Sequence, residues 1–355
     1  MIYHLRWMWQ WILGEVFSRP GRLIAMLFFL TLFVLPVFTT TPSTLRFLIL
    51  AAIYAIFAAS WDLLAVTGQV SLGQALFFGS AGYTAALINI HFGFPIWVTV
   101  PLGGLSAVFI GLIAGIPALR LRGFYLALVT LAFPVIFTGI IYIFPEFFGG
   151  EMGLIGIDRI SKNRVIIYYT VVLVMMVSGF IMWKLSDASS KIIRTGIIFH
   201  AIREDEIAAR LAGINTVKYK LLAYAISAFF AGIAGGLYIH FIRIAGPSSL
   251  DVFFSFQVLL WAIFGGKGTI YGAIAGVYIL FPMTEYITIY EWGENFRHII
   301  MSLILIFTLL FMPEGISVWI LDKLGIICLR CKVVNFANRK NCRACRAPLH
   351  LENQK

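Results

Sequence analysis

Long apolar segments recur along almost the whole chain, and each is long enough to cross a lipid bilayer as a helix. A hydrocarbon core needs about 20 apolar residues per helical crossing. Of the 355 residues 61% are hydrophobic and only 12% are charged, whereas soluble domains carry about 25% charged residues. This composition excludes a soluble domain held by one or two anchors, and it predicts an all-α integral membrane protein.

The positions of the apolar runs and of the charges between them predict the topology. Ten spans are expected near 23–38, 45–65, 74–91, 96–117, 124–143, 165–183, 219–242, 253–265, 270–290 and 298–312. An even number places both termini on one side of the membrane. Lys and Arg outnumber acids in 1–22, in 184–220 and in 321–355, and basic loops stay in the cytoplasm. Both termini are therefore expected there.

The same pattern divides the chain into three parts. Residues 1–22 are expected to form a cytoplasmic N-terminal segment, and 23–38 a retained first span rather than a cleaved signal peptide. Residues 23–315 form the membrane domain, which includes a cytoplasmic loop over 184–218. Residues 316–355 form a cytoplasmic tail.

Two segments interrupt the hydrophobic pattern with glycine and polar residues at membrane depth. Irregular backbone there needs partners from protein or from a water-filled cavity, so broken helices favour a translocation pathway. Close packing of helices at glycine is the alternative explanation. The candidate pathway residues are Gly68, Gln69, Ser71, Gly73 and Gln74 in the first segment, and Gly265, Gly266, Gly268 and Thr269 in the second.

A charged, Ala-rich segment over 200–215 is predicted to form one short helix within the cytoplasmic loop. Strong helix formers fill it, acids precede bases, and Gly213 suits the residue just past a helix end. A small Ala-rich patch framed by charge is typical of a segment that docks into another protein, although a solvated loop would have the same composition. The residues concerned are Arg203, Glu204, Glu206, Ala208, Ala209 and Gly213.

Four blocks, 61–79, 201–215, 219–232 and 265–269, occur in the order typical of one family. Together they resemble the permeases of branched-chain amino-acid ABC importers, specifically the LivM-type subunit, and the resemblance runs from about 45 to 315. Two positions depart from the family pattern. Ile207 stands where an acid would precede Ala208, and Asp62 replaces an uncharged amide; for Asp62 a structural role is favoured over substrate contact.

The resemblance implies a ten-span permease in the cell inner membrane, surrounded by lipid, with broken or re-entrant segments and no cofactor in the membrane domain. It implies four partners, namely a second permease, two ABC ATPase subunits and a soluble substrate-binding protein. The loop over 184–218 would couple the ATPases to the spans. The substrate would be a branched-chain amino acid or a related small polar solute.

A self-sufficient secondary transporter or channel is the alternative function. Such a protein would need charged groups inside its spans for ion coupling, and the predicted spans hold few besides Asp62 and Glu285. An enzyme is disfavoured, because Gly265 to Thr269 lacks the spacing of a phosphate-binding loop and the histidines do not pair with acids. ATP hydrolysis is expected in partner subunits, and no nucleic-acid partner is expected.

The tail carries all four cysteines of the chain, in two Cys-x-x-Cys pairs separated by ten residues: Cys328 and Cys331, then Cys342 and Cys345. Two such pairs place four thiolates on one tetrahedral ion, so they predict a zinc-ribbon-like module over 326–348. A chance cluster of cysteines is the alternative. A module of about 25 residues needs the metal in order to fold, and a docking or stabilising role is favoured for it.

Overall fold

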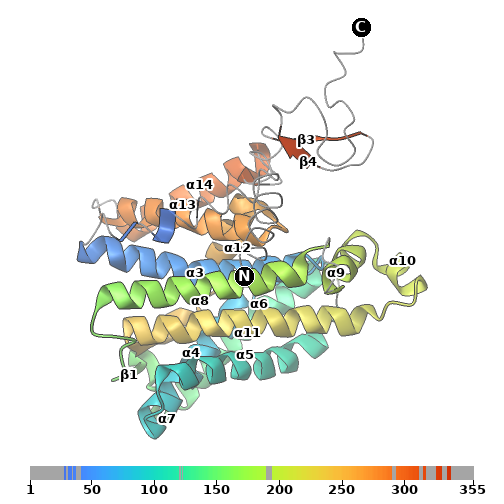
Figure 1. The fold of residues 1–355 in the computed structure, drawn as a ribbon. Coiled ribbons are helices and arrows are strands. Elements are labelled where there is room, and N and C mark those ends of the chain that lie inside the picture. The colour runs from blue at the N-terminus through green and yellow to red at the C-terminus, as the bar shows by residue number, and fades with distance from the viewer. Residues whose placement is uncertain are drawn as a thin grey trace, which may run out of the picture.

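The computed structural model describes residues 28, 31–33, 35–36, 41–119, 121, 123–188, 194–289, 293–311, 315–316, 325–329 and 334–336. The long helices are α3 (Pro42–Ala65), α4 (Gln74–Phe92), α5 (Ile96–Ala118), α6 (Phe124–Ile143), α8 (Arg164–Ser186), α11 (Thr216–Ile242), α12 (Val252–Gly266), α13 (Ile270–Ile289) and α14 (Gly293–Phe311). They lie side by side in a bundle, with α11 and α3 running through it (Figure 1).

Six of these helices are long and apolar enough to cross a membrane: α3, α4, α5, α6, α8 and α11. Their bounds agree with the predicted spans to within three residues. The predicted spans 253–265 and 270–290 appear as α12 and α13, which together pass the same test but are bent by 112° at a short break. They therefore form one broken span or a re-entrant loop, and the expected count of ten stays a prediction.

The first predicted span, 23–38, and the N-terminal segment lie mostly outside the described residues. The described part is held against α8, since the Tyr168 hydroxyl donates to the Leu32 carbonyl at 2.6 Å and the Tyr169 hydroxyl donates to the Phe33 carbonyl at 3.4 Å. The last predicted span, 298–312, corresponds to α14.

α3 is buried on every face from Leu48 onward, which fits a helix that is apolar all round and lies in the middle of a membrane bundle. α11 packs against α4 at small residues. A Cβ at Gly235 would overlap the backbone carbonyl of Phe78, so the backbones of the two helices touch there. This close packing fixes the two helices that border the cavity described below.

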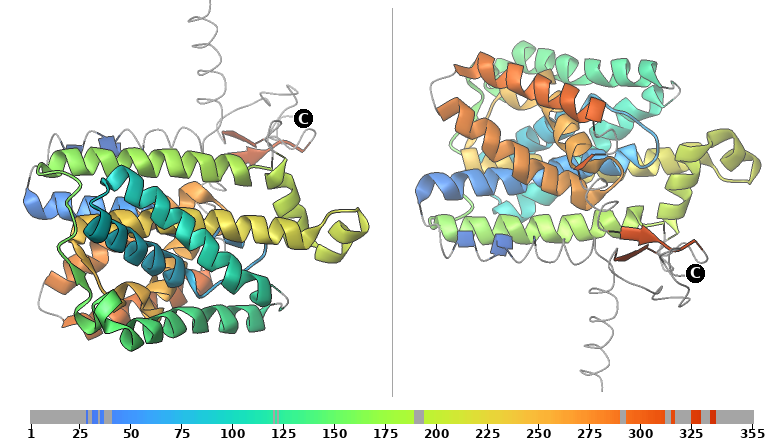
Figure 2. Two further views of the ribbon diagram at one scale, coloured as in Figure 1. Left: turned by 90° about the horizontal axis from the view of Figure 1, so that it is seen from below. Right: turned by 90° about the horizontal axis from the view of Figure 1, so that it is seen from above.

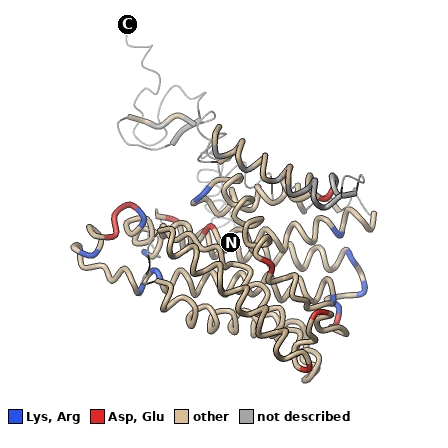
Figure 3. Tube along the Cα trace, turned by 180° about the vertical axis from the view of Figure 1, so that it is seen from behind, with Lys and Arg blue, Asp and Glu red and all other residues tan. Residues whose placement is uncertain are grey.

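Short elements mark the two ends of the bundle. At one end lie α7 (Pro145–Phe148), the 3-10 helices η1 (Gly150–Met152) and η2 (Pro247–Leu250), and the antiparallel pair β1 (Leu154–Ile155) and β2 (Ile244–Ala245). At the other end α9 (Thr195–Glu204) and α10 (Glu206–Leu211) project beyond the long helices (Figure 2). Charged residues gather mainly at these ends (Figure 3), as a lipid-facing middle requires.

The predicted single helix over 200–215 is wrong in one respect, because α9 and α10 are separate helices. Asp205 between them is extended, with φ −153° and ψ 106°, and its carboxylate accepts from the backbone N–H groups of Ile207 and Ala208 at 2.8 and 3.0 Å. An aspartate that caps a new helix in this way ends the preceding one. Gly213 lies just past the end of α10 with φ +82°, as predicted.

Two strands of the tail, β3 (Gly325–Ile327) and β4 (Val334–Phe336), pair antiparallel outside the helical bundle (Figure 1). Cys328 follows β3 directly and is buried. The other three cysteines, Cys331, Cys342 and Cys345, lie outside the described residues.

Candidate transport pathway and coupling site

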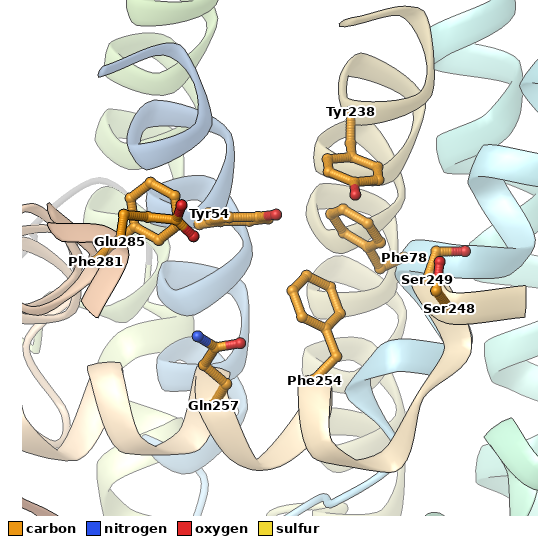
Figure 4. A pocket seen from close by; sticks show the side chains of 9 residues that line it. All are labelled: Tyr54, Phe78, Tyr238, Ser248, Ser249, Phe254, Gln257, Phe281 and Glu285. Carbon is orange, nitrogen blue, oxygen red and sulfur yellow. The ribbon is translucent and has the colours of Figure 1, made fainter. Parts of the chain in front are cut away.

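A cavity of about 160 Å³ opens between α3, α11, α12 and α13. It lies toward the β1–β2 end of the bundle, since two of its lining residues belong to η2, next to β2. α12 crosses beneath it, while α3 and α11 stand on either side (Figure 4). The broken span therefore supplies the floor of an internal cavity.

Aromatic rings form most of the cavity wall. Tyr54 of α3 lies among Phe254, Phe281 and Tyr238, with ring centroids 5.4, 5.1 and 6.0 Å away. Phe78 of α4 completes the wall, 5.3 Å from the ring of Tyr238. Rings at these separations pack edge-on or tilted, which favours a stable wall.

Four polar side chains complete the lining: Ser248, Ser249, Gln257 and Glu285. Glu285 lies in the otherwise apolar helix α13, and Gln257 rises from α12 into the cavity (Figure 4). A carboxylate within a membrane-spanning helix is costly and typically marks a substrate or ion pathway. None of the sequence-predicted pathway residues lines this cavity.

The two glycine-containing breaks instead meet at the α9–α10 end of the bundle, on either side of Arg203. A Cβ at Gly68 would lie 3.4 Å from the Arg203 Cα, and a Cβ at Gly268 would lie 2.9 Å from its guanidinium nitrogen Nη1. Both glycines have positive φ, +78° and +83°, which other residues rarely adopt. The end of α9 thus lies next to both breaks, with its exposed Arg203 close to each of them.

Asp62 ties α3 to the second break. Its side chain is fully buried, and Oδ1 accepts from the Gly268 backbone N–H at 2.6 Å, across 206 residues of sequence. The other carboxylate oxygen has no hydrogen-bond partner among the described residues. Asp62 therefore joins α3 to the second break, and the preference for a structural role over substrate contact stays a prediction.

The polar residues of the first break hold helices together. Gln74 Nε2 donates to the hydroxyls of Ser60 and Ser227 at 3.0 and 2.9 Å, and Gln69 Nε2 donates to the Lys220 carbonyl at 3.3 Å. These contacts join α4 to both α3 and α11, and they join the first break to α11. Ser71 belongs to the same network, since its carbonyl accepts from Trp61 Nε1 at 2.8 Å. Their contact with substrate stays a prediction.

Two of the other predicted pathway residues, Gly73 and Gly265, lie where the backbones of two elements touch. A Cβ at Gly73 would overlap the Thr130 carbonyl of α6, and a Cβ at Gly265 would overlap the Gly272 carbonyl of α13. Gly266 is buried at the end of α12, and the Thr269 hydroxyl donates to its carbonyl at 2.6 Å. The structure therefore uses the breaks to bring helices into close contact.

Glu206 anchors α10 to α11. Its carboxylate accepts from Lys220 Nζ at 2.6 Å and from the Thr216 hydroxyl at 3.2 Å, and it pairs with Arg210. Burial by itself would raise the pKa of Glu206, but the hydrogen bonds and charges of Lys220 and Arg210 outweigh it and lower the pKa to about 2. The carboxylate therefore stays ionised at neutral pH and holds α10 in place.

The projecting segment presents apolar side chains to its surroundings. Leu211 is 86% exposed and Ile207 62% exposed, while Ala209 is buried against the loop and Ala208 is exposed. Glu204 lies at the end of α9 and is also exposed. An anchored short helix with uncovered apolar residues has the form of a docking element for another protein.

The family model for the permease component of branched-chain amino acid transport systems matches residues 43–309. The chain belongs to this family. The match covers every long helix from α3 to α13 and most of α14, and it includes the cavity, both breaks and the α9–α10 loop. The chain is accordingly a multi-pass membrane protein.

Curated relatives agree with this assignment. The chain is 29% identical over 323 residues to the high-affinity branched-chain amino acid transport system permease protein LivM of Escherichia coli, covering 82% of this chain and 74% of that protein. The LivM protein of Salmonella typhimurium is 29% identical over 280 residues, which cover 71% of this chain and 64% of that protein. The probable LivH protein of Methanocaldococcus jannaschii is 25% identical over 265 residues, or 71% and 84%. No solved structure matches the chain.

Most of the cavity lining in this permease could not be predicted from its amino-acid sequence. The aromatic lining residues come from five separate helices, and rings are common throughout the chain. Glu285 was noted only as one of two acids within the spans. That isolated carboxylate in an apolar run was the one available signal. Within the described ranges, no group of three His, Cys, Asp or Glu residues is placed to hold a metal.

Proposed function

We propose that this permease is the membrane-spanning subunit of an ABC importer that takes up branched-chain amino acids or a related small polar solute across the cell inner membrane. The family assignment and the names of the LivM and LivH relatives support the transport of branched-chain amino acids. In this proposal the chain catalyses no reaction itself. Separate ATPase subunits hydrolyse ATP, and their movements open and close the pathway.

The contact between Arg203 and both breaks is the observation that carries the proposal. α9 ends at the junction of Gly68 and Gly268, and α10 continues outward with Leu211 uncovered. A force applied to α10 would therefore reach the ends of α3, α12 and α13 through packed contacts. An ATPase changes the conformation only through different affinities for its two states, and an anchored, projecting helix provides the element to grip.

The remaining partners follow from the same proposal. A second permease subunit would complete the pathway, two ATPases would bind at the α9–α10 end, and a soluble substrate-binding protein would deliver solute at the β1–β2 end. The excess of Lys and Arg in 184–220 and in both terminal segments supports a cytoplasmic position for α9, α10 and the termini.

Reconstitution of the assembled importer tests the coupling. L-leucine uptake driven by ATP is measured in vesicles with wild-type chain, with Leu211→Asp and with the control Leu121→Asp. Leu121 lies at the same end of the bundle, on the turn between α5 and α6. Burying a charge at a docking surface costs at least about 3 kcal/mol, so Leu211→Asp should reduce uptake by about a hundredfold without changing the unfolding temperature.

Two results would overturn the proposal. Unchanged uptake by Leu211→Asp, with Leu121→Asp also active, would show that α10 does not couple the ATPase. Accumulation of leucine by the purified chain alone, driven by a proton or sodium gradient, would make the protein a secondary transporter. Competition by urea and small amides in the same assay defines the substrate.

The cysteine tail would bind zinc through Cys328, Cys331, Cys342 and Cys345. The pairing of β3 with β4 supports this, because the first Cys-x-x-Cys pair falls between the two strands in sequence. Metal analysis of the purified full-length chain should find one zinc ion per chain. The double substitution Cys342→Ser and Cys345→Ser should remove it, and full retention of zinc by that variant would contradict the assignment.

A further inference from the structure

We propose that the cavity between α3, α11, α12 and α13 binds a small solute that carries a primary ammonium group on a short apolar chain, and that Glu285 recognises the ammonium. The proposal rests on the transport function above and adds to it a solute site within the permease itself. Size, wall chemistry and charge each support this ligand class.

The size of the cavity limits the ligand to a small molecule. Its volume is about 160 Å³, and an apolar cavity of about 150 Å³ holds benzene. A ligand of roughly six to nine non-hydrogen atoms therefore fits. Peptides, nucleotides and sugars larger than this are excluded by volume.

The wall chemistry favours a ligand that is cationic at one end and apolar at the other. The ring of Tyr54 packs directly against Phe254, Phe281 and Tyr238, with centroids 5.1 to 6.0 Å apart, so these rings present one continuous aromatic surface to a group in the cavity. Cations within about 6 Å of a ring centroid are attracted to its face. The tyrosine hydroxyls point into the space between the helices (Figure 4), where they can accept from an ammonium.

Charge decides which end of a solute is bound. Glu285 supplies a carboxylate at the cavity, and no Lys or Arg is among the lining residues. A carboxylate and electron-rich rings attract an ammonium and repel an isolated anion. Gln257 and Ser248 add neutral polar groups, which can hydrogen-bond a second polar group of the solute without selecting its charge.

The cavity is also placed where the broken span can act on it. Phe254 and Gln257 belong to α12, whose last residue precedes the break that contacts Asp62 and Arg203. A shift of α12 at the break would move the cavity floor. Solute bound here therefore lies against the helix that leads directly into the break next to Arg203.

Two fragments of leucine, each with only one of its two charged groups, test which group the cavity binds. The full-length chain is used in lipid nanodiscs. 3-Methylbutylamine keeps the ammonium and lacks the carboxylate, whereas 4-methylpentanoate keeps the carboxylate and lacks the ammonium. Binding of each, and of L-leucine, is measured by saturation-transfer difference NMR. The amine should bind the wild-type chain about tenfold or more tightly than the acid.

Matched substitutions locate the site. Glu285→Gln should weaken binding of the amine by about tenfold or more, whereas Glu146→Gln, on the exposed helix α7 at the same end of the bundle, should leave it unchanged. Phe254→Leu should weaken binding about threefold, and its neighbour Phe253→Leu, which is exposed and does not line the cavity, should not. Glu285→Asp keeps the charge and should retain part of the affinity.

The outcomes separate this site from the transport function. Equal binding of acid and amine by the wild-type chain, or full affinity in Glu285→Gln, would overturn the site even if the assembled importer takes up leucine. Binding of the amine that depends on Glu285, combined with no ATP-driven uptake by the assembled importer, would keep the site and overturn the proposed function. The comparison of the two fragments needs no variant, so a folding defect in Glu285→Gln leaves the test decisive.

Discussion

Replacing Gly265 with alanine tests whether α12 and α13 contact each other as a broken span. The added Cβ would overlap the Gly272 carbonyl and would lie 3.1 Å from the backbone nitrogen of Ala273. Both groups belong to backbone, so no side chain can rotate away. Non-bonded heavy atoms prefer separations of about 3.5–4.0 Å, and the two helices must therefore move apart.

Two opposing effects determine how much Gly265→Ala lowers the free energy of unfolding. Overpacking costs about 1–3 kcal/mol, and rigid backbone on both sides favours the upper end. The higher helix propensity of alanine, compared with glycine, offsets about 1 kcal/mol of the overpacking cost. The net loss is about 2 kcal/mol. Gly139→Ala serves as the matched control, since Gly139 lies within α6 with no atom within 4 Å of its added Cβ, and it should gain about 0.5–1 kcal/mol.

Thermal unfolding of the two variants in the same detergent measures the difference. A gap of about 3 kcal/mol corresponds to roughly 5 °C or more, with Gly265→Ala melting below wild type. Binding of 3-methylbutylamine should weaken in the same variant, because α12 forms the cavity floor. If Gly265→Ala melts together with Gly139→Ala, the backbones of α12 and α13 do not touch at this point, and the reasoning fails.

Three further changes test the contacts at the two ends of the bundle. Asp62→Asn keeps an acceptor for the Gly268 N–H but loses the charge, so it should lower the free energy of unfolding by about 1 kcal/mol, and Asp62→Leu, which loses the acceptor as well, should cost about 2–3 kcal/mol; equal losses would contradict a role for the hydrogen bond to Gly268. The pKa of Glu206 is lowered from 4.5 to about 2, so its carboxylate should stabilise the chain fully above pH 4.5 and progressively less as the pH falls toward 2. The difference in melting temperature between wild type and Glu206→Gln should therefore shrink over that pH range. A difference that stays constant would refute the ion pairing. Asn89, which exchanges hydrogen bonds of 2.9 and 3.0 Å with Asp158, should on substitution by alanine speed hydrogen exchange in the 154–163 loop, and unchanged exchange would show that the loop is held elsewhere.

The membrane class and the helix positions could be predicted because hydropathy is a local property. α4, for example, was expected over 74–91 and extends over Gln74–Phe92. The signal sums over about 20 neighbouring residues, so no tertiary contact is needed to find it. Gly213 was likewise predicted as the residue past a helix end, since only local backbone conformation decides that position.

The break between α9 and α10 was not predicted, because the composition of 200–215 favours helix throughout. An aspartate can lie within a helix or can cap a new helix with its carboxylate, as Asp205 does, and the choice depends on where the chain must turn. Glu206 and Lys220, which fix α10 against α11, are 14 residues apart and show no spacing that marks them as partners.

The sequence by itself determined that this chain lies in a membrane, where its helices run and which family it joins, since each of these depends on neighbouring residues or on ordered motifs. Only the tertiary structure decided that Asp62 meets Gly268, that Arg203 lies between the two breaks, and that Tyr54 and Glu285 share one cavity. Those contacts depend on how the helices pack, and the packing energy comes from many weak contacts between segments that are distant in sequence. No local pattern records which of those segments will touch.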